Sequence, residues 1–306
     1  MSDRAGPADR YPTRLAHAAE SPRSDPVVWP GAGDGPVGAD ALAVYDRDGF
    51  LELPDLFEAD EVAGLLTEAD RLCSDPAVLN DERAILEPVG GELRSLFEVH
   101  AVSRVFADLV EDQRLVGHAR QILGSEVYVH QSRINLKPGF GAAGFYWHSD
   151  FETWHAEDGM PAPRALSFSI ALTDNLPING PLMIMPGSHR TFVGCVGETP
   201  SEHFRFSLRR QEIGTPEQPS LAALADRFGI RQFTGRAGTA TVFDSNCMHG
   251  SGDNITPYPR RNVFVVYNSV ENRLVEPFRC ASRRPEFVAA RSFTPTLTRL
   301  GVAVHD

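Results

Sequence analysis

The sequence contains little cysteine, which limits the kinds of site and fold that it can build. Cys73, Cys195, Cys247 and Cys280 are scattered over 306 residues, and no two of them form a C-x-x-C pair. This pattern indicates neither a disulfide framework nor a thiolate zinc site, so we expect reduced thiols. Cys247 in particular is expected to be a small buried residue rather than a soft metal ligand.

Long apolar runs and clusters of basic residues are also missing. No apolar run approaches the ~20 residues of a bilayer-spanning helix, and the first residues, MSDRAGPADRYPTR, lack the apolar core of a signal peptide. The net charge of -12 comes without any Lys and Arg cluster, although nucleic acids and anionic membranes require concentrated positive charge. We therefore expect a cytoplasmic protein that binds a small molecule, with no nucleic-acid or membrane partner.

The composition is that of a chain with a full hydrophobic core. Hydrophobic residues make up 42% of the sequence and charged residues 23%, and the length suggests one large domain or two small ones. Residues 1–40 are rich in Pro, Gly, Ala, Asp and Ser and show no apolar period that could build core. We expect a flexible or surface-wrapped arm over residues 1–40 and a single domain over residues 41–306.

Helical patterns come first in this domain. Val62, Leu65, Leu66, Ala69 and Leu72 are spaced to form one face of a helix after the short candidate strand RDGFLELPDLF. A second helix is predicted over residues 104–123. Between the two, DERAILEPVGGELRSLFEVH mixes turn residues with aromatics, and its pattern does not distinguish helix from strand.

After Gly124 the sequence becomes a succession of short candidate strands, each bounded by Gly, Pro, Asn or Asp. They are EVYVHQSRINLKP, GFYWHSDF, RALSFSIALTD, GPLMIMPGS, GTATVFDSN and RRNVFVVYNSV. Such a run is typical of antiparallel β structure with frequent reversals. Helices followed by many strands predict an α+β protein whose core is a β-sandwich or jelly roll with supporting helices.

Three residues in this second half have the chemistry of a metal site. If GFYWHSDF is a strand, His148 and Asp150 project from one face and can bind one ion. His249, at a strand end, is the candidate for the third ligand. Two histidines and one carboxylate form the facial triad of non-haem Fe(II) enzymes, although an isolated H-x-D triplet has little specificity.

Other residues near these three compete for roles in the site. His155 and Glu152 are expected to support the metal ligands or to belong to a substrate loop, and His189 in the turn PGSHR is expected to be exposed. Trp154 is compatible with ordinary packing, and the acidic pair Glu157 and Asp158 with a solvated surface.

Arg260 adds the prediction of an anionic ligand. It follows His249 by eleven residues, and in RRNVFVVY it shares one strand face with Asn262, Phe264 and Val266. An arginine inside a barrel is costly unless it meets an anion, and a guanidinium can bind a carboxylate through two hydrogen bonds. A surface arginine at a strand start is the alternative, but the ordered set of H-x-D, distal His and Arg favours a 2-oxoglutarate-dependent oxygenase.

These features together resemble a known family. RDGFLELPDLF, the H-x-D triplet, NGPLMIMPGSHR and the distal HGS followed by Arg260 look like the phytanoyl-CoA dioxygenase-like group of iron and 2-oxoglutarate oxygenases. The longer string FYWHSDFETWHAEDGMP is similar to the signature of the branch of this group that hydroxylates the compatible solute ectoine. The resemblance runs from about Tyr45 to near the C-terminus.

The resemblance implies an enzyme with a double-stranded β-helix (jelly-roll) core that forms a homodimer. It also implies an activity that uses Fe(II), 2-oxoglutarate and O2 to convert ectoine to 5-hydroxyectoine. It implies Fe(II) ligands at His148, Asp150 and His249. It implies 2-oxoglutarate contacts at Phe145, Asn135, Ser167, Ser251 and Arg260. It implies ectoine contacts at Gln131, Thr153, Trp154, Phe243, Phe264 and Arg284.

The residue types agree with a zwitterionic ligand that carries an amidinium cation and a carboxylate. Gln131, Arg133 and Asn135 alternate on one face of their candidate strand, where they would make a poor core but a good ligand wall. Aromatic side chains such as Phe243 would offer faces to the cation. FETWH is expected to continue from the strand into a loop that closes over the substrate, and AEDGMP to turn the chain back.

Two alternatives remain at this point. The same triad could serve another small zwitterion or an acyl thioester, although the lack of a basic patch disfavours a coenzyme A thioester. The triad could instead hold structural zinc in a ligand-binding jelly roll, but structural zinc takes four ligands and the sequence offers no convincing fourth.

Overall fold

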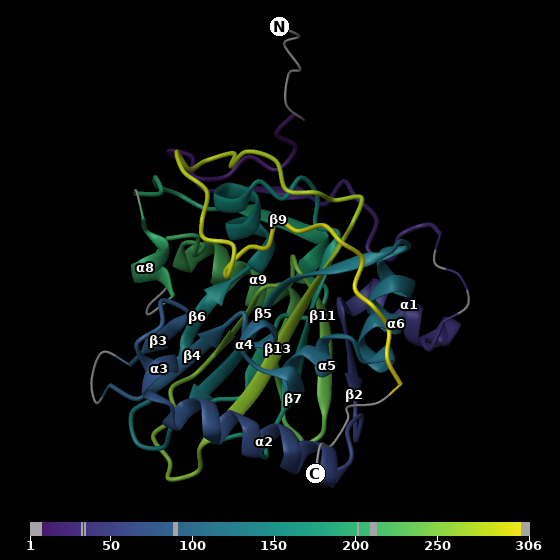
Figure 1. Cartoon of the computed structure of the whole chain (residues 1–306). Helices are drawn as coiled ribbons and strands as arrows, with labels where there is room; N and C mark the ends of the chain where they lie inside the picture. The colour runs from purple at the N-terminus through teal and green to yellow at the C-terminus, as the bar shows by residue number, and fades with distance from the viewer. Residues whose placement is uncertain are drawn as a thin grey trace, which may run out of the picture.

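Most strands belong to two antiparallel sheets that pack face to face (Figure 1). The computed structural model describes residues 8–31, 33, 35–87, 91–200, 202–208 and 213–300. Within these residues, the larger sheet has the strand order β2 (Phe50–Leu53), β11 (Ala240–Asp244), β7 (Ala165–Ala171), β13 (Arg260–Ser269), β5 (Val127–Lys137), β4 (Leu93–Phe97) and β3 (Ala84–Leu86). The smaller sheet has the order β10 (Arg231–Phe233), β8 (Leu182–Ile184), β12 (His249–Ser251) and β6 (Phe145–His148).

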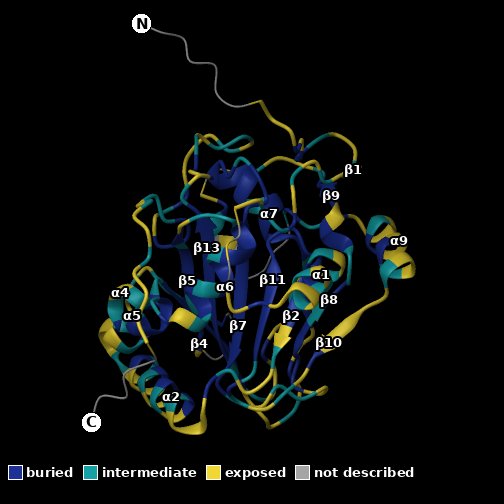
Figure 2. Cartoon of the chain, turned by 90° about the vertical axis from the view of Figure 1, so that its right-hand side faces the viewer, coloured by how far each residue is buried: buried dark blue, intermediate teal, exposed yellow. Residues whose placement is uncertain are grey.

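Helices cover the outer face of the larger sheet, as Figure 1 shows for α2 (Ala59–Ser74), α5 (Arg104–Val110) and α6 (Gln113–Leu123). Their apolar side chains join those of the sheet in one cluster, which is the main hydrophobic core. Figure 2 shows the central strands β7, β11 and β13 of this sheet buried, whereas α2 keeps an exposed outer side. The remaining helices are α1 (Ala39–Asp48), α3 (Pro76–Leu79), α4 (Val99–Val102), α7 (Asp150–Thr153), η1 (Trp154–Asp158), η2 (Ser188–Arg190), α8 (Phe204–Ser207) and α9 (Gln218–Phe228).

A second apolar cluster lies between the two sheets. It contains Phe50, Phe243 and Phe264 of the larger sheet together with Leu182 and Ile184 of the smaller one. Side chains that follow each other along a strand point to opposite faces, so Val263 and Val265 enter the main core while Phe264 faces the smaller sheet. The predicted jelly-roll architecture, the six predicted strands and the alternation along β13 are confirmed.

The predictions for the first half are partly right. In α2, Val62, Leu65, Ala69 and Leu72 are buried as expected, and Leu66 packs against the same cluster. The single helix expected over 104–123 is wrong, because Asp112 interrupts it and caps α6 by accepting a hydrogen bond from the Arg114 backbone N–H at 2.8 Å. The ambiguous stretch 81–100 forms β3 and β4, apart from 88–90, which lie outside the described residues.

The expectation that residues 1–40 add nothing to the core is wrong for several of them. Tyr11 is 1% exposed and packs on Phe151, with ring centroids 5.0 Å apart in an edge-to-face arrangement. Val27 and Val37 belong to the main core. The strand β1 (Ala19–Pro22) pairs with β9 (Thr191–Gly194) in a separate two-stranded sheet. Composition missed these contacts because they depend on partners far away in the sequence.

The chain turns sharply from strand to helix at the H-x-D triplet. Strand β6 ends at His148, and Ser149 then caps α7 by accepting a hydrogen bond from the Glu152 backbone N–H at 3.4 Å. The next residues form the π-helix η1, which ends at Gly159 with φ of 76°. FETWH is therefore helical, and the loop predicted there is wrong; Gly159 does turn the chain, because it adopts a conformation that suits glycine.

In the described part of the chain, no helix combines the length and apolarity required to cross a bilayer.

Candidate active site

The pairing of β6 with β12 brings two histidines together. His148 and His249 are direct register partners in this antiparallel pair, where opposite side chains on one face lie close to each other. Their ring centroids are 4.2 Å apart, and both residues are buried. The proximity therefore follows from strand register and does not depend on a flexible loop.

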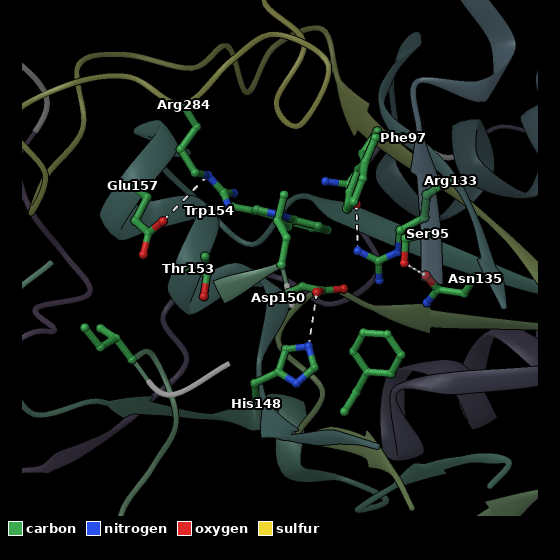
Figure 3. A pocket seen from close by; sticks show the side chains of 14 residues that line it. Ser95, Phe97, Arg133, Asn135, His148, Asp150, Thr153, Trp154, Glu157 and Arg284 are labelled. Atoms are coloured by element: carbon green, nitrogen blue, oxygen red, sulfur yellow. Dashed lines mark hydrogen bonds and ion pairs between the residues drawn. The ribbon is translucent and has the colours of Figure 1, made fainter. Parts of the chain in front are cut away.

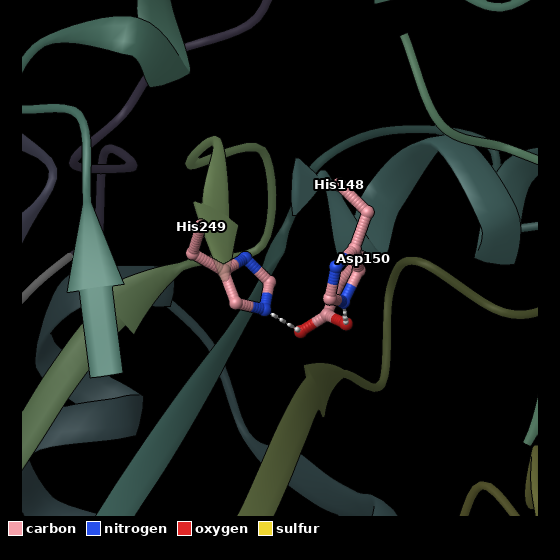
Figure 4. Close-up of side chains that lie close together, drawn as sticks. All are labelled: His148, Asp150 and His249. Atoms are coloured by element: carbon pink, nitrogen blue, oxygen red, sulfur yellow. Dashed lines mark ion pairs between the residues drawn. The ribbon is translucent and has the colours of Figure 1, made fainter. Parts of the chain in front are cut away.

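Asp150 reaches the two histidines from the start of α7 (Figure 4). Its Oδ1 lies 3.7 Å from His148 Nε2, and its Oδ2 lies 3.9 Å from His249 Nε2. One ligand atom of each residue lies within 4.8 Å of the others. The prediction that His148 and Asp150 project from one face of a strand is wrong, because Asp150 lies on α7. The turn at Ser149 nevertheless brings the carboxylate to the histidines.

Hydrogen bonds at the outer ring nitrogens orient both imidazoles. His148 Nδ1 lies 2.6 Å from the Tyr146 carbonyl oxygen, and His249 Nδ1 lies 3.0 Å from the Cys247 carbonyl oxygen. Because a carbonyl only accepts, Nδ1 carries the proton and Nε2 keeps a free lone pair toward Asp150. Burial, and then the neighbouring His148, lower the pKa of His249 to about 4, which keeps this ring neutral at pH 7.

These donors fit a divalent iron ion. Two neutral imidazoles and one carboxylate are the ligands of the facial triad, which leaves coordination positions for exogenous groups. Ser167 Oγ donates to Asp150 Oδ2 at 3.3 Å, which orients the carboxylate. Among the residues that the structure describes, His148, Asp150 and His249 are the one group of His, Cys, Asp or Glu side chains that is close enough to bind a metal ion. The group has no fourth protein ligand of the kind that structural zinc requires.

Two adjoining cavities meet at these ligands. The smaller cavity is lined by His249 and the larger by Asp150, and His148 lines both. The wall that the two cavities share is Arg133, Asn135, Phe145 and His148. A metal at the triad would therefore face both cavities.

The smaller cavity has a buried cation without a counterion. Arg260 is 1% exposed, its Nε has no hydrogen-bond partner, and no carboxylate pairs with its guanidinium among the residues described. Burial lowers the pKa of Arg260 to about 10, with Arg94 acting in the same direction, so the guanidinium remains charged at pH 7. A buried charge of this kind calls for an anionic ligand.

Ser251 and Lys137 lie at the same end of this cavity. Ser251 lines the cavity and accepts a hydrogen bond from Lys137 Nζ at 3.0 Å. Lys137 is fully buried and also donates to the Gly252 carbonyl oxygen. Arg133 and Arg260 line the smaller cavity and make it electropositive, which favours an anionic ligand.

The larger cavity combines aromatic, amide and charged side chains (Figure 3). Trp154 and Thr153 come from the helical turn after Asp150, and Trp154 is 3% exposed. Gln131 is held by donating through Nε2 to the Val288 carbonyl oxygen at 2.6 Å and accepting from Arg133 Nη1 at 2.9 Å. Arg284 borders the cavity while donating to Asp158 Oδ1 through Nε at 2.8 Å. This wall suits a small polar ligand with a flat face.

The residues assigned to 2-oxoglutarate and ectoine by resemblance fall into three groups in the structure. Phe145, Asn135, Ser251 and Arg260 line the smaller cavity, as does Phe264. Gln131, Thr153, Trp154 and Arg284 line the larger one. Phe243 and Ser167 line neither cavity: Phe243 packs on His249 with ring centroids 5.0 Å apart, and Ser167 contacts Asp150.

Several cavity residues were not predicted from the sequence. Ser95 and Phe97 line the larger cavity from β4, and Ser95 Oγ donates to Asn135 Oδ1 at 2.6 Å. Arg94 of the same strand stacks over Phe145, with its Cζ 4.2 Å from the ring centroid. The strand lies in the stretch whose pattern was ambiguous; alternation of Ser95 and Phe97 around Leu96 was the available signal.

Five other residues that were weighed for roles in or near the site are buried. His189 is fully buried, with Nε2 3.1 Å from the Asp46 carbonyl oxygen, so the exposure predicted for it is wrong. Glu157 and Asp158 are 2% and 0% exposed, which excludes the solvated surface. His155 lines neither cavity in the described structure; its ring stacks on Phe278 at 4.1 Å. Cys247 is buried, as expected.

Fold and site together define the class of protein. A jelly-roll core that carries a two-histidine, one-carboxylate centre between an electropositive cavity and an aromatic one is the arrangement of a non-haem iron oxygenase. The chain belongs to the phytanoyl-CoA dioxygenase (PhyH) family, which matches residues 45–262.

Relatives within this family are more specific. The chain is 62% identical over 289 residues to an ectoine dioxygenase of Streptomyces coelicolor, an alignment that covers 94% of this chain and 96% of the relative. It is 55% identical to the ectoine dioxygenase of Sphingopyxis alaskensis, covering 92% of this chain and 93% of the relative. The crystal structure of EctD from S. alaskensis with 2-oxoglutarate and 5-hydroxyectoine superposes with a TM-score of 0.86 at 50% identity, covering 96% of this chain and 99% of that one.

Proposed function

We propose that this protein is an Fe(II)- and 2-oxoglutarate-dependent dioxygenase that hydroxylates ectoine to 5-hydroxyectoine and releases succinate and CO2. The observation that carries the proposal is the triad His148, Asp150 and His249 at the junction of two cavities. One of these cavities contains Arg260, whose guanidinium has no carboxylate partner among the described residues. The choice of substrate rests on relatives named ectoine dioxygenase and on the EctD complex with 5-hydroxyectoine.

His148, Asp150 and His249 would hold Fe(II), which when bound supplies the activation of dioxygen that the reaction needs. The protein's own part is to orient both imidazoles through the carbonyls of Tyr146 and Cys247, so that Nε2 of each ring is available to the metal. A divalent ion bound by one carboxylate and two neutral imidazoles keeps one net positive charge, which suits an anionic cosubstrate.

The smaller cavity would hold 2-oxoglutarate. Arg260 offers two parallel donors to the distal carboxylate, and Ser251 offers a hydroxyl beside it. Asn135, oriented by Ser95, and the face of Phe145 would fix the chain of the cosubstrate. Ser167 would act through Asp150, whose carboxylate it contacts.

The larger cavity would hold ectoine next to the triad. The ring of ectoine is a delocalised cation, so the face of Trp154 can attract it as well as bury it. Phe264, although assigned to ectoine by resemblance, lines the smaller cavity. Gln131 and Thr153 offer polar atoms to the ring nitrogens or the carboxylate, and Arg284 a cation to the carboxylate. Phe243 would act indirectly, by packing against His249. These residues orient the substrate and exclude water, which the reaction requires.

The cellular setting belongs to the same proposal. We place the enzyme in the cytoplasm, in the synthesis of a compatible solute during osmotic stress. The free state of Cys73, Cys195, Cys247 and Cys280 supports a reducing compartment. A homodimer is proposed from the resemblance alone.

The test is an aerobic incubation of purified, iron-loaded protein with 2-oxoglutarate and ectoine, in which succinate and product mass are followed together. The proposal requires succinate and a product heavier by one oxygen atom in equal amounts, with NMR locating the hydroxyl at C5. Succinate without oxidised ectoine would keep the oxygenase and reject the substrate. Neither product from protein shown to contain Fe(II) would reject catalysis altogether and favour a binding protein.

A further inference from the structure

The N-terminal segment reaches the wall of the larger cavity through Arg14. Thr13 and Arg14 are 0% and 7% exposed. Arg14 has a φ of 56°, in the left-handed region that residues other than glycine seldom occupy. Such backbone strain persists where the surrounding contacts determine it, and it often marks a functional position.

Those contacts are carboxylates on the helical stretch that follows Asp150. Arg14 Nε donates to Glu152 Oε1 at 2.7 Å and Nη2 to Glu152 Oε2 at 3.1 Å, so this pair is bidentate. The same Nη2 donates to Glu157 Oε1 at 3.1 Å. Thr13 Oγ1 adds a donor to Glu152 Oε1 at 2.5 Å. One arginine of the N-terminal segment thus binds two acidic residues from consecutive turns.

The other side of Glu157 is open to the larger cavity, as Figure 3 shows together with its ion pair to Arg284. Arg284 Nε lies 3.7 Å from Glu157 Oε2, but its short hydrogen bonds go to Asp158. Glu152, Glu157 and Asp158 therefore share two guanidinium groups, which leaves one formal negative charge in excess among these five buried groups. Burial raises the pKa of Glu157, so its charged form gains from any further cation.

The segment containing Gly214 closes over the network. A Cβ added to Gly214 would lie 2.7 Å from both Arg14 Nη2 and Glu152 Oε2, and the residue has a φ of 78°. Both the φ value and the close approach favour glycine here. Arg14 is consequently enclosed between the helical stretch and Gly214, and it has little room to change partners.

We propose that Arg14 is a positioning residue for the substrate, which holds the Glu157 carboxylate in the cavity wall where it meets the cationic ring of ectoine. The inference rests on the proposed function. Without Arg14, the two buried carboxylates lose their common counterion, and Glu157 either turns toward Arg284 or becomes protonated. In both cases the ring loses the negative charge that it faces, and the substrate loses orientation relative to the triad.

The test compares Arg14→Met, Arg14→Lys and Glu157→Gln with the wild type. Anaerobic calorimetry with 2-oxoglutarate present measures ectoine binding, and aerobic assays measure KM and the ratio of succinate to hydroxylated product. Arg14→Met should weaken ectoine binding at least tenfold, leave the KM for 2-oxoglutarate within twofold, and release succinate in excess of product. Arg14→Lys should recover part of the loss, because it restores the charge but not the bidentate geometry.

Arg23→Met is the matched control. Arg23 is another arginine of the N-terminal segment whose side chain is buried; it pairs with Asp244 at 2.8 Å and lines neither cavity. We expect it to lower stability without changing ectoine affinity or the succinate ratio. An equal loss of ectoine affinity in Arg23→Met would overturn the inference, because the effect would then follow from the fold of the segment in general.

A double-mutant cycle keeps the inference testable if Arg14→Met folds poorly. The double variant with Arg14→Lys and Glu157→Gln should lose less free energy of ectoine binding than the sum of the two single losses, because both changes act through one contact. Additive losses of ectoine affinity would overturn the inference. Wild-type enzyme that neither binds nor hydroxylates ectoine would reject the proposed function and this inference together. If the wild type is active, and Arg14→Met binds ectoine as tightly and releases one succinate per hydroxylated product, this inference alone is rejected.

Discussion

Lys137 Nζ donates to Ser251 Oγ at 3.0 Å, at the end of the cavity that contains Arg260. Burial, and then the positive charges of Arg260 and Arg94, lower the pKa of Lys137 to about 6. Lys137 is the only lysine in the sequence. The titration of this one lysine side chain therefore reports on the charge of the cavity.

This relationship predicts that 2-oxoglutarate binding takes up a proton. Below pH 6 the lysine is protonated in the free enzyme, so its titration does not change the affinity for 2-oxoglutarate with pH. Above that pH the free enzyme holds a neutral amine, while the bound dianion favours the ammonium. The affinity should thus fall by about tenfold per pH unit until the pKa of the bound state is reached. Calorimetry in two buffers of different ionisation enthalpy measures the uptake directly.

Lys137→Met provides the comparison for this pH dependence. The variant should bind 2-oxoglutarate with an affinity that is flat over the same range. Labelling the lysine at Cε with carbon-13 gives one side-chain resonance, whose titration should move to higher pH when 2-oxoglutarate is added. A resonance that titrates near the ordinary lysine value in the free enzyme would contradict the prediction.

Arg260→Met should affect cosubstrate binding and stability in opposite directions. Truncating one partner of a buried charge pair costs about 2–5 kcal/mol, so the KM for 2-oxoglutarate should rise by roughly 30-fold or more. Without ligand, the change removes a buried cation that has no counterion in the described structure. The free energy of unfolding should therefore increase, on the order of 1 kcal/mol.

Arg261→Met controls for the loss of an arginine from the same strand. Its guanidinium faces outward and pairs with Asp70, and surface pairs contribute little. We expect a KM for 2-oxoglutarate close to that of the wild type. Urea unfolding of both variants, with and without 2-oxoglutarate, gives the stability comparison; a destabilised, ligand-free Arg260→Met would show that the guanidinium has a structural partner.

Removing one triad ligand should abolish both iron binding and turnover. Loss of an outer-shell partner already costs about 10- to 100-fold in metal affinity, and a ligand contributes more. We expect His249→Ala and Asp150→Ala to retain little Fe(II) after dialysis and to produce no detectable succinate. His17→Ala, which removes an exposed histidine, should match the wild type. A His249→Ala sample that keeps wild-type iron content and activity after dialysis would remove this residue from the triad.

The sequence was a good guide where local periodicity decides structure. Gln131, Arg133 and Asn135 alternate along β5 and line the cavity, as predicted. The same period explains why Arg260 and Phe264 share a face of β13. Strand alternation depends on the residue itself and its immediate neighbours, so it can be read from one sequence.

Contacts between distant segments could not be predicted in this way. Arg14 and Glu152 are 138 positions apart, and nothing in the Pro- and Gly-rich N-terminal composition indicates their pairing. His189 is buried because its ring meets the backbone of Asp46 from another element. Ser149 was missed as a helix cap, although a serine directly before the first helical residue is a common start signal.

Arg284 is the residue whose role is best separated by paired measurements. Its Nε and Nη2 are bound to Asp158, so Nη1 is the guanidinium nitrogen that has no partner in the described structure and could reach a substrate carboxylate. Breaking a buried ion pair costs about 3–5 kcal/mol, so Arg284→Met should lower the free energy of unfolding by that amount. Arg284→Lys keeps the charge but loses the bidentate geometry, and its KM for ectoine should rise about tenfold with kcat retained. Arg283→Met, which removes a half-exposed neighbour paired with Glu276, should change neither quantity. If Arg284→Lys loses stability while its KM for ectoine stays at the wild-type value, Arg284 supports the cavity wall through Asp158 and does not bind substrate.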